Sequence, residues 1–563
     1  MTIVTDHPAL IATRARRAGI LSGALGLAAL LIALLVIVPI ATVAVNLVHS
    51  TDLMAHLAAT VLPGYVINTI WMMLGVPLAT IIIGTGAAWL VTMCSFPGRR
   101  IFEWALILPL AAPAYVLAYT YTDFLQHSGP LQTALRDLTG WGPRDYWFPN
   151  IRSLPGAISL FALTLYPYVY LLARAAFLEQ SVCVLEASRT LGEKPWGAFT
   201  RVALPLARPA IATGAALALM ETLADFGTVS YFGVQTFTTG IYRALYSFAD
   251  RVAAAQLASG LLGFVILVLA VERYSRGRRR FNQTTGVYRP IRRFQLTGIK
   301  AACAWLFCAL PLALGFILPA ILLVVMTIQD GHALFGARYV QLVWNSVSLA
   351  TVTACIAVAL AIVLAYANRH IRRPFMRGAT RVAATGYAIP GSIIAVGILL
   401  PLAAFDNWLD GVMNAAFGLS TGLLLTGTGV ALVYAYLVRF LAVSLQTAEA
   451  SLAKITPSMD EAARTLGRGP WRTATEVHAP LMAGSLMTAG LIVFVDVMKE
   501  LPATMILRPF NFDTLAVQAY NLAKDERLTQ ASTASLMIVA VGVIPLIFLS
   551  RRIARSRPGD RIE

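Results

Sequence analysis

Charged residues are scarce in this chain. Asp, Glu, Lys and Arg make up only 13% of its 563 residues, whereas soluble domains contain about 25%. A soluble chain of this length would divide into several domains, each of which needs a polar surface. The polar residues are too few to cover such surfaces, while 58% of the residues are hydrophobic. This scarcity of charge indicates that lipid surrounds most of the chain.

Several catalytic and metal-binding motifs are also missing. The loop that cradles ATP phosphates, G-x-x-x-x-G-K-[ST], needs a lysine after a glycine, and none of the five lysines follows one. The sequence contains no nucleophile elbow and no H-E-x-x-H motif, and its seven histidines are scattered. The five cysteines form no paired metal-ligand spacing. We therefore expect no enzyme activity, no ATP hydrolysis by this chain and no cofactor; the sequence leaves any metal site unknown.

What the chain does have is a series of long apolar runs. A helix needs roughly 20 apolar residues to cross a bilayer. Twelve such runs predict an all-α polytopic membrane protein of about twelve transmembrane helices. The runs are 20–48, 66–92, 103–124, 155–178, 209–230, 252–272, 301–328, 342–367, 380–404, 420–446, 482–506 and 534–550.

One polar segment occurs twice between these runs. EASRTLGEKPWGAFTRVALP extends from Glu186 to Pro205, and EAARTLGRGPWRTATEVHAP extends from Glu461 to Pro480. The two copies agree at 11 of 20 positions without a gap and lie 275 residues apart. They follow the fourth and the tenth apolar run, so the chain is predicted to consist of two six-helix repeats.

The residues of this segment predict a helix, a tight turn and a second helix. Gly192 and Gly467 are suited to the left-handed conformation that ends a helix. Pro195 and Pro470 can each open the following helix, because a proline at the first position loses no hydrogen bond. Duplication explains two copies, but not why this segment stayed similar while the flanking helices diverged. We therefore expect both copies to dock onto the same kind of partner surface.

Basic residues indicate the orientation of the chain. With twelve spans and the N-terminus inside, the loops on the opposite side carry only 9 of the 44 Lys and Arg residues. The positive-inside rule then places both termini and the link Glu272–Lys300 in the cytoplasm, and residues 125–153 in the periplasm. Nucleic-acid binding could also explain the net charge of +17. The basic residues alternate from loop to loop, which is better explained by membrane topology and by contact with anionic lipids. We therefore expect no nucleic-acid partner.

The repeated segment resembles the cytoplasmic signature of permeases in bacterial binding-protein-dependent ABC importers. That signature is Glu-Ala-Ala, three residues, Gly, nine residues and Ile-x-Leu-Pro. In the second copy Ala479 stands where the family has Leu, which puts the end of that helix in doubt. The matching residues are Glu186, Ala187, Gly192 and Pro205 in the first copy and Glu461, Ala462, Gly467 and Pro480 in the second.

The resemblance covers nearly the whole chain as two fused permease units. It implies the type I ABC importer permease fold, located in the bacterial inner membrane. It also implies an ATPase subunit, in two copies, that docks on the repeated loops, and a periplasmic substrate-binding protein. The expected segments are an N-terminal tail with the first helix (1–61), a first permease unit (62–272), a basic cytoplasmic linker (273–300), a seventh helix with its loop (301–340), a second permease unit (341–550) and a basic cytoplasmic tail (551–563).

Five ionisable residues within the fifth and eleventh runs form the candidate translocation path: Glu221, Asp225, Asp496, Lys499 and Glu500. Glu221 aligns with Asp496, and Asp225 with Glu500, at the same 275-residue offset. In a straight helix that starts near residue 209, Glu221 would lie about 18 Å into the bilayer. Charges at this depth are costly and usually line a path or a protein interior. Their spacing of four predicts a shared helix face. The alternative is that these residues tie helices together through buried hydrogen bonds or an Asp–Lys pair.

The path residues lie in two longer stretches, METLADFGTVSYFGVQTFTTGIYRALY from Met220 and VDVMKELPATMILRPFNFDTLAVQAY from Val495. These two stretches and the fused layout resemble the ferric-iron branch of the family. Carboxylate oxygens suit hard cations, which agrees with a cargo of this kind. Permeases for thiamine and for aminoethylphosphonate are alternatives within the same family. A secondary transporter can also have six plus six helices, but it would not need a repeated docking loop.

Overall fold

The structure is a computed structural model that describes residues 8–49, 51–142, 144–179, 195–276, 293–329, 336–371 and 373–555. Contacts between residues divide the chain into two compact units. Unit 1 comprises Met1–Val48 and Asn345–Phe512, and unit 2 comprises His49–Trp344 and Asp513–Glu563. Each unit thus combines helices from both sequence repeats.

Membrane-spanning helices account for most of the described ranges. Eleven helices there are long and apolar enough to cross a membrane, or twelve if the bent pair Arg99–Ala111 and Ala114–Thr139 is one span. This confirms the predicted all-α architecture of about twelve helices, in which the third span is bent by 91°. The predicted start of the ninth span, at residue 380, is wrong. Residues 374–383 form a separate amphipathic helix, and the span itself begins at Gly391.

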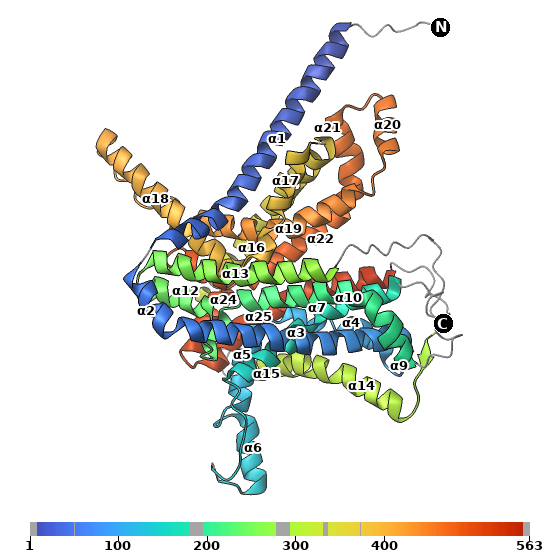
Figure 1. The fold of residues 1–563 in the computed structure, drawn as a ribbon, viewed down its shortest axis with the longest axis vertical. Coiled ribbons are helices and arrows are strands. Elements are labelled where there is room, and N and C mark those ends of the chain that lie inside the picture. Colours follow the sequence, from blue (N-terminus) through green and yellow to red (C-terminus); the bar gives the residue numbers. More distant parts are fainter. Residues whose placement is uncertain are drawn as a thin grey trace. The chain divides into compact units, whose positions relative to one another are not determined.

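Unit 2 is built largely from the first repeat, with later helices packed against it (Figure 1). Helices α3, α7 and α10 pack against one another, and α15 and α25 contact each other. Its elements are α2 (Asp52–Thr60), α3 (Leu62–Met93), β1 (Cys94–Ser95), α4 (Arg99–Ala105), η2 (Leu108–Ala111), α5 (Ala114–Leu125), α6 (Pro130–Thr139), α7 (Leu154–Glu179), α9 (Pro195–Gly197), η3 (Ala198–Ala203), α10 (Leu204–Ala224), α11 (Gly227–Tyr231), α12 (Phe237–Tyr246), α13 (Arg251–Arg276), β2 (Phe294–Gln295), α14 (Ile299–Leu312), η4 (Ala313–Ile317), α15 (Leu318–Gln329), α24 (Leu515–Lys524) and α25 (Leu528–Arg555).

Unit 1 is built largely from the second repeat and includes the first helix of the chain. Helix α1 packs on α17 and α18, and α19 packs on α22. Its elements are α1 (Pro8–Val45), η1 (Asn46–Val48), most of α16 (Ala337–His370), α17 (Pro374–Ala383), η6 (Gly386–Ala388), α18 (Gly391–Phe417), α19 (Gly429–Leu452), α20 (Pro457–Thr465), α21 (Pro470–Thr473), η7 (Ala474–His478), α22 (Ala479–Met498) and α23 (Pro502–Leu507).

The 275-residue repeat of the sequence is also a repeat of structure. Helix α3 begins at Leu62 and α16 begins 275 residues later, at Ala337. The same offset relates the starts of α4 and α17, of α7 and α19, of α10 and α22, and of α11 and α23. The two repeats therefore share the positions at which these helices start, even where their side chains differ.

Glycine allows the central helices of unit 2 to approach closely. A Cβ atom at Gly84 of α3 would lie 2.8 Å from the carbonyl oxygen of Tyr166, and one at Gly214 of α10 would lie 2.7 Å from Cα of Val169. Both contacts are on α7, so α3 and α10 pack closely against the same helix. Close approach through small residues is the usual way in which membrane helices gain packing contacts.

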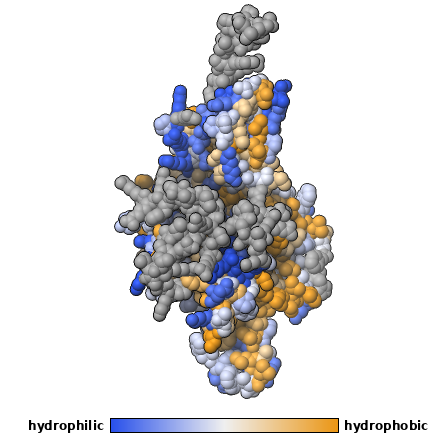
Figure 2. All heavy atoms as spheres, turned by 90° about the vertical axis from the view of Figure 1, so that its right-hand side faces the viewer, coloured by the Kyte–Doolittle hydropathy of each residue, from blue (hydrophilic) through white to orange (hydrophobic). Residues whose placement is uncertain are grey.

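Large apolar side chains remain exposed along the spans. Leu34 of α1, Leu74 and Leu78 of α3 and Leu306 of α14 are each more than half exposed. The face drawn in Figure 2 carries broad hydrophobic areas. Surfaces of this kind are stable in lipid and would aggregate in water.

Candidate functional site

The second copy of the repeated segment is a helix, a turn and a helix, as predicted. Helix α20 ends at Thr465, and Gly467 follows with a left-handed φ of 75°. Pro470 then opens α21. In the first copy, Pro195 likewise opens α9, whereas Glu186, Ala187 and Gly192 lie outside the described residues.

Both copies enter the membrane through a short π-helix. The backbone N–H of Leu204 donates to Phe199, five residues earlier, and that of Ala479 donates to Ala474 in the same way. Pro205 and Pro480 come next, each as the second residue of a long helix. Because proline has no N–H, it interrupts the regular ladder, which favours such a local widening. The departure at Ala479 therefore leaves the helix start unchanged.

The outer side of the second loop is exposed. Glu461 and Ala462 are both exposed on α20. Met459 is 43% exposed and Leu466 is 79% exposed. This small surface mixes apolar and polar groups, as contact sites between proteins commonly do.

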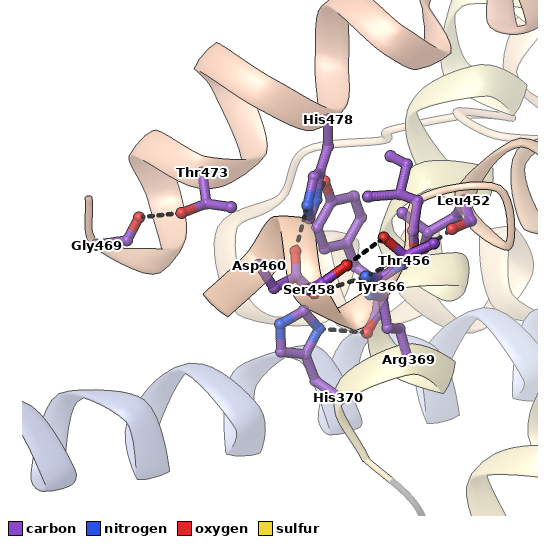
Figure 3. Close-up of polar contacts among 11 residues, drawn as sticks. Tyr366, Arg369, His370, Leu452, Thr456, Ser458, Asp460, Gly469, Thr473 and His478 are labelled. Carbon is purple, nitrogen blue, oxygen red and sulfur yellow. Dashed lines mark hydrogen bonds and ion pairs between the residues drawn. The ribbon is translucent and has the colours of Figure 1, made fainter. Parts of the chain in front are cut away.

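The inner side of the same loop is held by an ion pair and a hydrogen-bonded chain (Figure 3). Arg369 Nη2, at the end of α16, donates to Asp460 Oδ2 of α20 over 2.6 Å. Asp460 Oδ1 lies 2.7 Å from Nε2 of His478, whose Nδ1 lies 2.7 Å from the hydroxyl of Tyr366. Arg369 Nη1 also donates to the carbonyl oxygen of Leu452, over 2.8 Å. These contacts join the loop to the ends of three membrane helices, and we call the residues Tyr366, Arg369, Asp460 and His478 the loop anchor.

Electrostatics keep Asp460 ionised within the loop anchor. Partial burial raises the pKa of this carboxyl. Hydrogen bonds from Arg369 and His478 lower it by a larger amount, so the pKa lies below its ordinary value. A carboxylate can only accept, so His478 donates through Nε2 and a neutral ring accepts from Tyr366 through Nδ1.

Sequence reasoning missed the loop anchor, although a signal was present. At the 275-residue offset, Leu185 and Ala203 stand where the second copy has Asp460 and His478. A polar pair that appears in only one of two similar loops indicates a contact specific to that loop.

Two carboxylates of the candidate path cap short helices. Asp225 follows the last residue of α10, and its carboxylate accepts from the backbone N–H groups of Thr228 and Val229 at 2.9 and 3.3 Å. Glu500 does the same for α23, with N–H groups of Ala503 and Thr504 at 3.0 and 3.1 Å. Glu500 is also paired with Arg439 Nη1 at 3.1 Å, and both side chains are buried.

The remaining path candidates lie in the last turns of the long helices or, for Lys499, directly after one. Asp496 Oδ1 pairs with Lys499 Nζ at 2.9 Å. Glu221 lies in the last turn of α10 and is half-buried. The predicted shared helix face is wrong, because α10 ends at Ala224 and α22 ends at Met498, ahead of the second carboxylate in each repeat. These contacts favour the alternative that Asp225, Asp496, Lys499 and Glu500 tie helices together.

Comparison with known proteins agrees with the repeated, membrane-spanning design. Residues 80–280 match the family described as binding-protein-dependent transport system inner membrane component. An Fe(3+)-transport system permease protein of Haemophilus influenzae is 26% identical over 86% of this chain and 89% of its own length. A probable ABC transporter permease protein of Sinorhizobium fredii is 24% identical over 87% of each chain. A molybdenum transport system permease protein of Escherichia coli is 32% identical over 26% of this chain and 60% of its own.

The duplicated helices and the repeated loop thus define a multi-pass permease of the inner membrane. The match to the family of binding-protein-dependent inner membrane components covers residues 80–280, and the similarity to the Haemophilus influenzae and Sinorhizobium fredii permeases extends over most of the chain.

Proposed function

We propose that this chain is the permease subunit of an ABC importer that moves ferric iron from a periplasmic binding protein across the inner membrane. The observation that carries the proposal is the similarity to the Fe(3+)-transport permease, which extends over 86% of this chain and so includes both repeats. Hydrolysis of ATP belongs to a separate subunit, since the sequence has no phosphate-cradling loop.

Two copies of that ATPase subunit would dock on the two loops, one on each. The residues we assign to these contacts are Glu186, Ala187, Gly192 and Pro205 in the first loop and Glu461, Ala462, Gly467 and Pro480 in the second. In the second loop, the exposed side of α20 and the residue after it support this role, because they leave Met459 and Leu466 available to a partner. The loop anchor behind it would transmit a displacement of α20 to α16 and α22.

The permease units of this proposal are residues 62–272 and 341–550. The common helix starts at Leu62 and Ala337 support these boundaries. Both termini and the linker 273–300 face the cytoplasm in the proposed topology. A reporter that is active only in the periplasm should be silent when fused at Gly286 and active when fused at Leu138 of α6; activity at Gly286 would contradict the twelve-span orientation.

The cargo is tested with the complete complex in proteoliposomes. Ferric-loaded binding protein should stimulate ATP hydrolysis and drive uptake of labelled iron into the vesicles. Molybdate is the main comparison, because a relative named for molybdenum transport matches part of the chain; thiamine and aminoethylphosphonate are the others. If one of these solutes stimulates ATP hydrolysis and iron does not, that solute, and not iron, is the cargo. Iron uptake that continues without ATP would instead favour a secondary transporter.

A further inference from the structure

Trp89, in the last turns of α3, contacts the chain on both sides of the first loop. Its ring packs edge-on against Phe177, near the end of α7, with ring centroids 5.6 Å apart. It also packs against Phe199 of η3, with centroids 5.0 Å apart. Aromatic rings attract one another at separations of about 4.5–7 Å. Helix α7 precedes the loop and η3 belongs to its last part, so this buried ring contacts the chain where it enters the loop and where it leaves it.

The linker between the two halves of the chain reaches the same ring. Near its end it forms β2, which pairs in parallel with β1, so that Phe294 lies opposite Cys94. The backbone N–H of Leu296 donates to the carbonyl oxygen of Ser95 over 3.0 Å. The ring centroid of Phe294 lies 6.4 Å from that of Trp89. The linker is therefore held against the end of α3 by backbone and side-chain contacts.

These contacts belong to one hydrophobic core. The core contains Trp89 and Phe177, and both Phe199 and Phe294 pack against it. A further ring leads from it to the surface, because Trp196 of α9 packs against Phe199 with centroids 5.4 Å apart and is 73% exposed. A series of aromatic contacts thus extends from the linker to an exposed tryptophan of the first loop.

The second loop has different chemistry at the corresponding positions. At the 275-residue offset, the second repeat has Leu364, Leu452 and Ala474 in place of Trp89, Phe177 and Phe199. The first repeat in turn has no charged counterpart of the loop anchor, whose positions hold Val91, Cys94, Leu185 and Ala203. Aromatic rings therefore lie beside the first loop where an ion pair lies beside the second.

We propose that Trp89 and Phe294 are positioning residues for the first loop, and that β2 of the linker takes the place that the loop anchor has in the second loop. This inference rests on the proposed function, in which an ATPase subunit docks on the first loop. Without the Phe294 ring, a space opens beside Trp89, and packed cores relax only partly around such a space. Trp89 then holds η3 less firmly, and α9, which continues directly into η3, is less well positioned for the partner.

The same contacts connect the first loop to the central helices of unit 2. Trp89 lies one turn before Met93, at which α3 ends, and η3 continues into α10 without a break. Helices α3, α7 and α10 pack against one another, and close-packed interiors transmit strain. A force that a partner applies to the loop would therefore reach all three helices, while β2 limits the movement of the Trp89 ring.

The test uses the complete complex in proteoliposomes, with ATP hydrolysis measured against the concentration of loaded binding protein. Rates are expressed per ATPase subunit retained in the vesicles. The test variant is Phe294→Ala, and Phe294→Tyr is the conservative variant that keeps the ring. The matched control is Phe264→Ala, because Phe264 of α13 is likewise a partly exposed ring that packs on a buried one, Phe237, with centroids 5.4 Å apart.

We expect the maximal stimulated rate to fall about fivefold in Phe294→Ala, equivalent to about 1 kcal/mol. It should stay near the wild-type value in Phe294→Tyr and in Phe264→Ala. The concentration of binding protein that gives half-maximal stimulation should not change, because that protein binds on the opposite side of the membrane. A loss of maximal rate alone separates a positioning role from a general distortion of the permease.

Equal maximal rates in Phe294→Ala and Phe264→Ala, or a shift of the half-maximal concentration in Phe294→Ala, would overturn the positioning role. If Phe294→Ala is absent from the membrane, Phe294→Leu and Phe264→Leu, which keep an apolar side chain, give the same comparison. A wild-type complex whose ATP hydrolysis does not respond to loaded binding protein would instead refute the proposed function.

Discussion

His478 Nε2 lies 2.7 Å from Asp460 Oδ1, so a direct hydrogen bond holds the second repeated loop against the start of α22. The same carboxylate accepts from Arg369 at the end of α16. A loop tied in this way to two membrane helices moves with them. Any force that a partner applies to α20 would therefore reach the membrane segment without passing through flexible chain.

The first prediction is that Asp460→Asn weakens coupling. The substitution removes the charge from two hydrogen bonds and should loosen the loop by about 1–2 kcal/mol, because charge-assisted bonds contribute more than neutral ones. We expect ATP hydrolysis stimulated by loaded binding protein to fall several-fold in the reconstituted complex, with normal abundance in the membrane.

Arg468→Gln is the control for this loop. Arg468 pairs with Glu476 at 2.8 Å, but both side chains are 44% exposed. Exposed pairs contribute little, typically under about 1 kcal/mol, so stimulation should stay near the wild-type value. If both variants behave alike, the loop anchor has no special part in coupling.

The second prediction concerns pH. The pKa of Asp460 lies below its ordinary value, because hydrogen bonds from Arg369 and His478 outweigh the effect of burial. A lowered folded-state pKa contributes stability above the unfolded value of about 3.9, and this contribution is lost as the pH falls through the folded value. We therefore compare amide hydrogen exchange in α20 between the wild type and Asp460→Asn. The rate in the wild type should rise relative to that in the variant only below about pH 4. An exchange rate that shows no relative change when the pH falls below about 4 would contradict this assignment.

The third prediction is that Gly467→Ala weakens coupling while Gly469→Ala does not. Gly467 has a φ of 75°, whereas Gly469 has no left-handed φ, and neither would bring a Cβ within 4 Å of another group. The two sites differ only in backbone conformation. An alanine in the left-handed conformation of Gly467 should destabilise the turn by about 1–2 kcal/mol. Stimulated ATP hydrolysis is the measurement. A bulky residue at Gly192 should act like one at Gly467, which remains a prediction from the sequence.

Much of this architecture could be predicted from the sequence because its causes are local. Apolar runs of sufficient length predict spans, and Gly467 followed by Pro470 predicts a helix end and a new start. The ends of α10 and α22 were missed, although Gly227 and Pro502 follow the carboxylates closely and the residue before a proline rarely stays helical. The loop anchor was beyond local reasoning, because Arg369 and Asp460 are 91 residues apart and meet only through tertiary packing.

The fourth prediction is that Arg439→Met destabilises the protein strongly. Glu500 would then be a buried carboxylate without its cation, a change that costs about 3–5 kcal/mol. Abundance in the membrane should fall sharply. Replacing both residues, as Arg439→Met with Glu500→Gln, should restore part of it, because Gln keeps hydrogen-bonding capacity and carries no charge. A double variant no more abundant than the single one would show that the lost guanidinium contacts, rather than the unpaired charge, are responsible.

The last prediction separates a transport role from a structural one for Glu221 and Asp496. Asp496 is paired with Lys499 at 2.9 Å, and its side chain is 15% exposed. Asp496→Asn leaves the Lys499 ammonium without its carboxylate, so abundance should fall, and Asp496→Asn with Lys499→Met should recover it.

Glu221→Gln keeps the size and hydrogen-bonding capacity of the side chain at the end of α10 while removing its charge. For a carboxylate that lines the path of a cation, uptake of labelled iron should drop with abundance unchanged. Unchanged uptake would remove Glu221 from the path. If instead its abundance falls as that of Asp496→Asn does, the aligned carboxylates of both repeats serve to hold helices together.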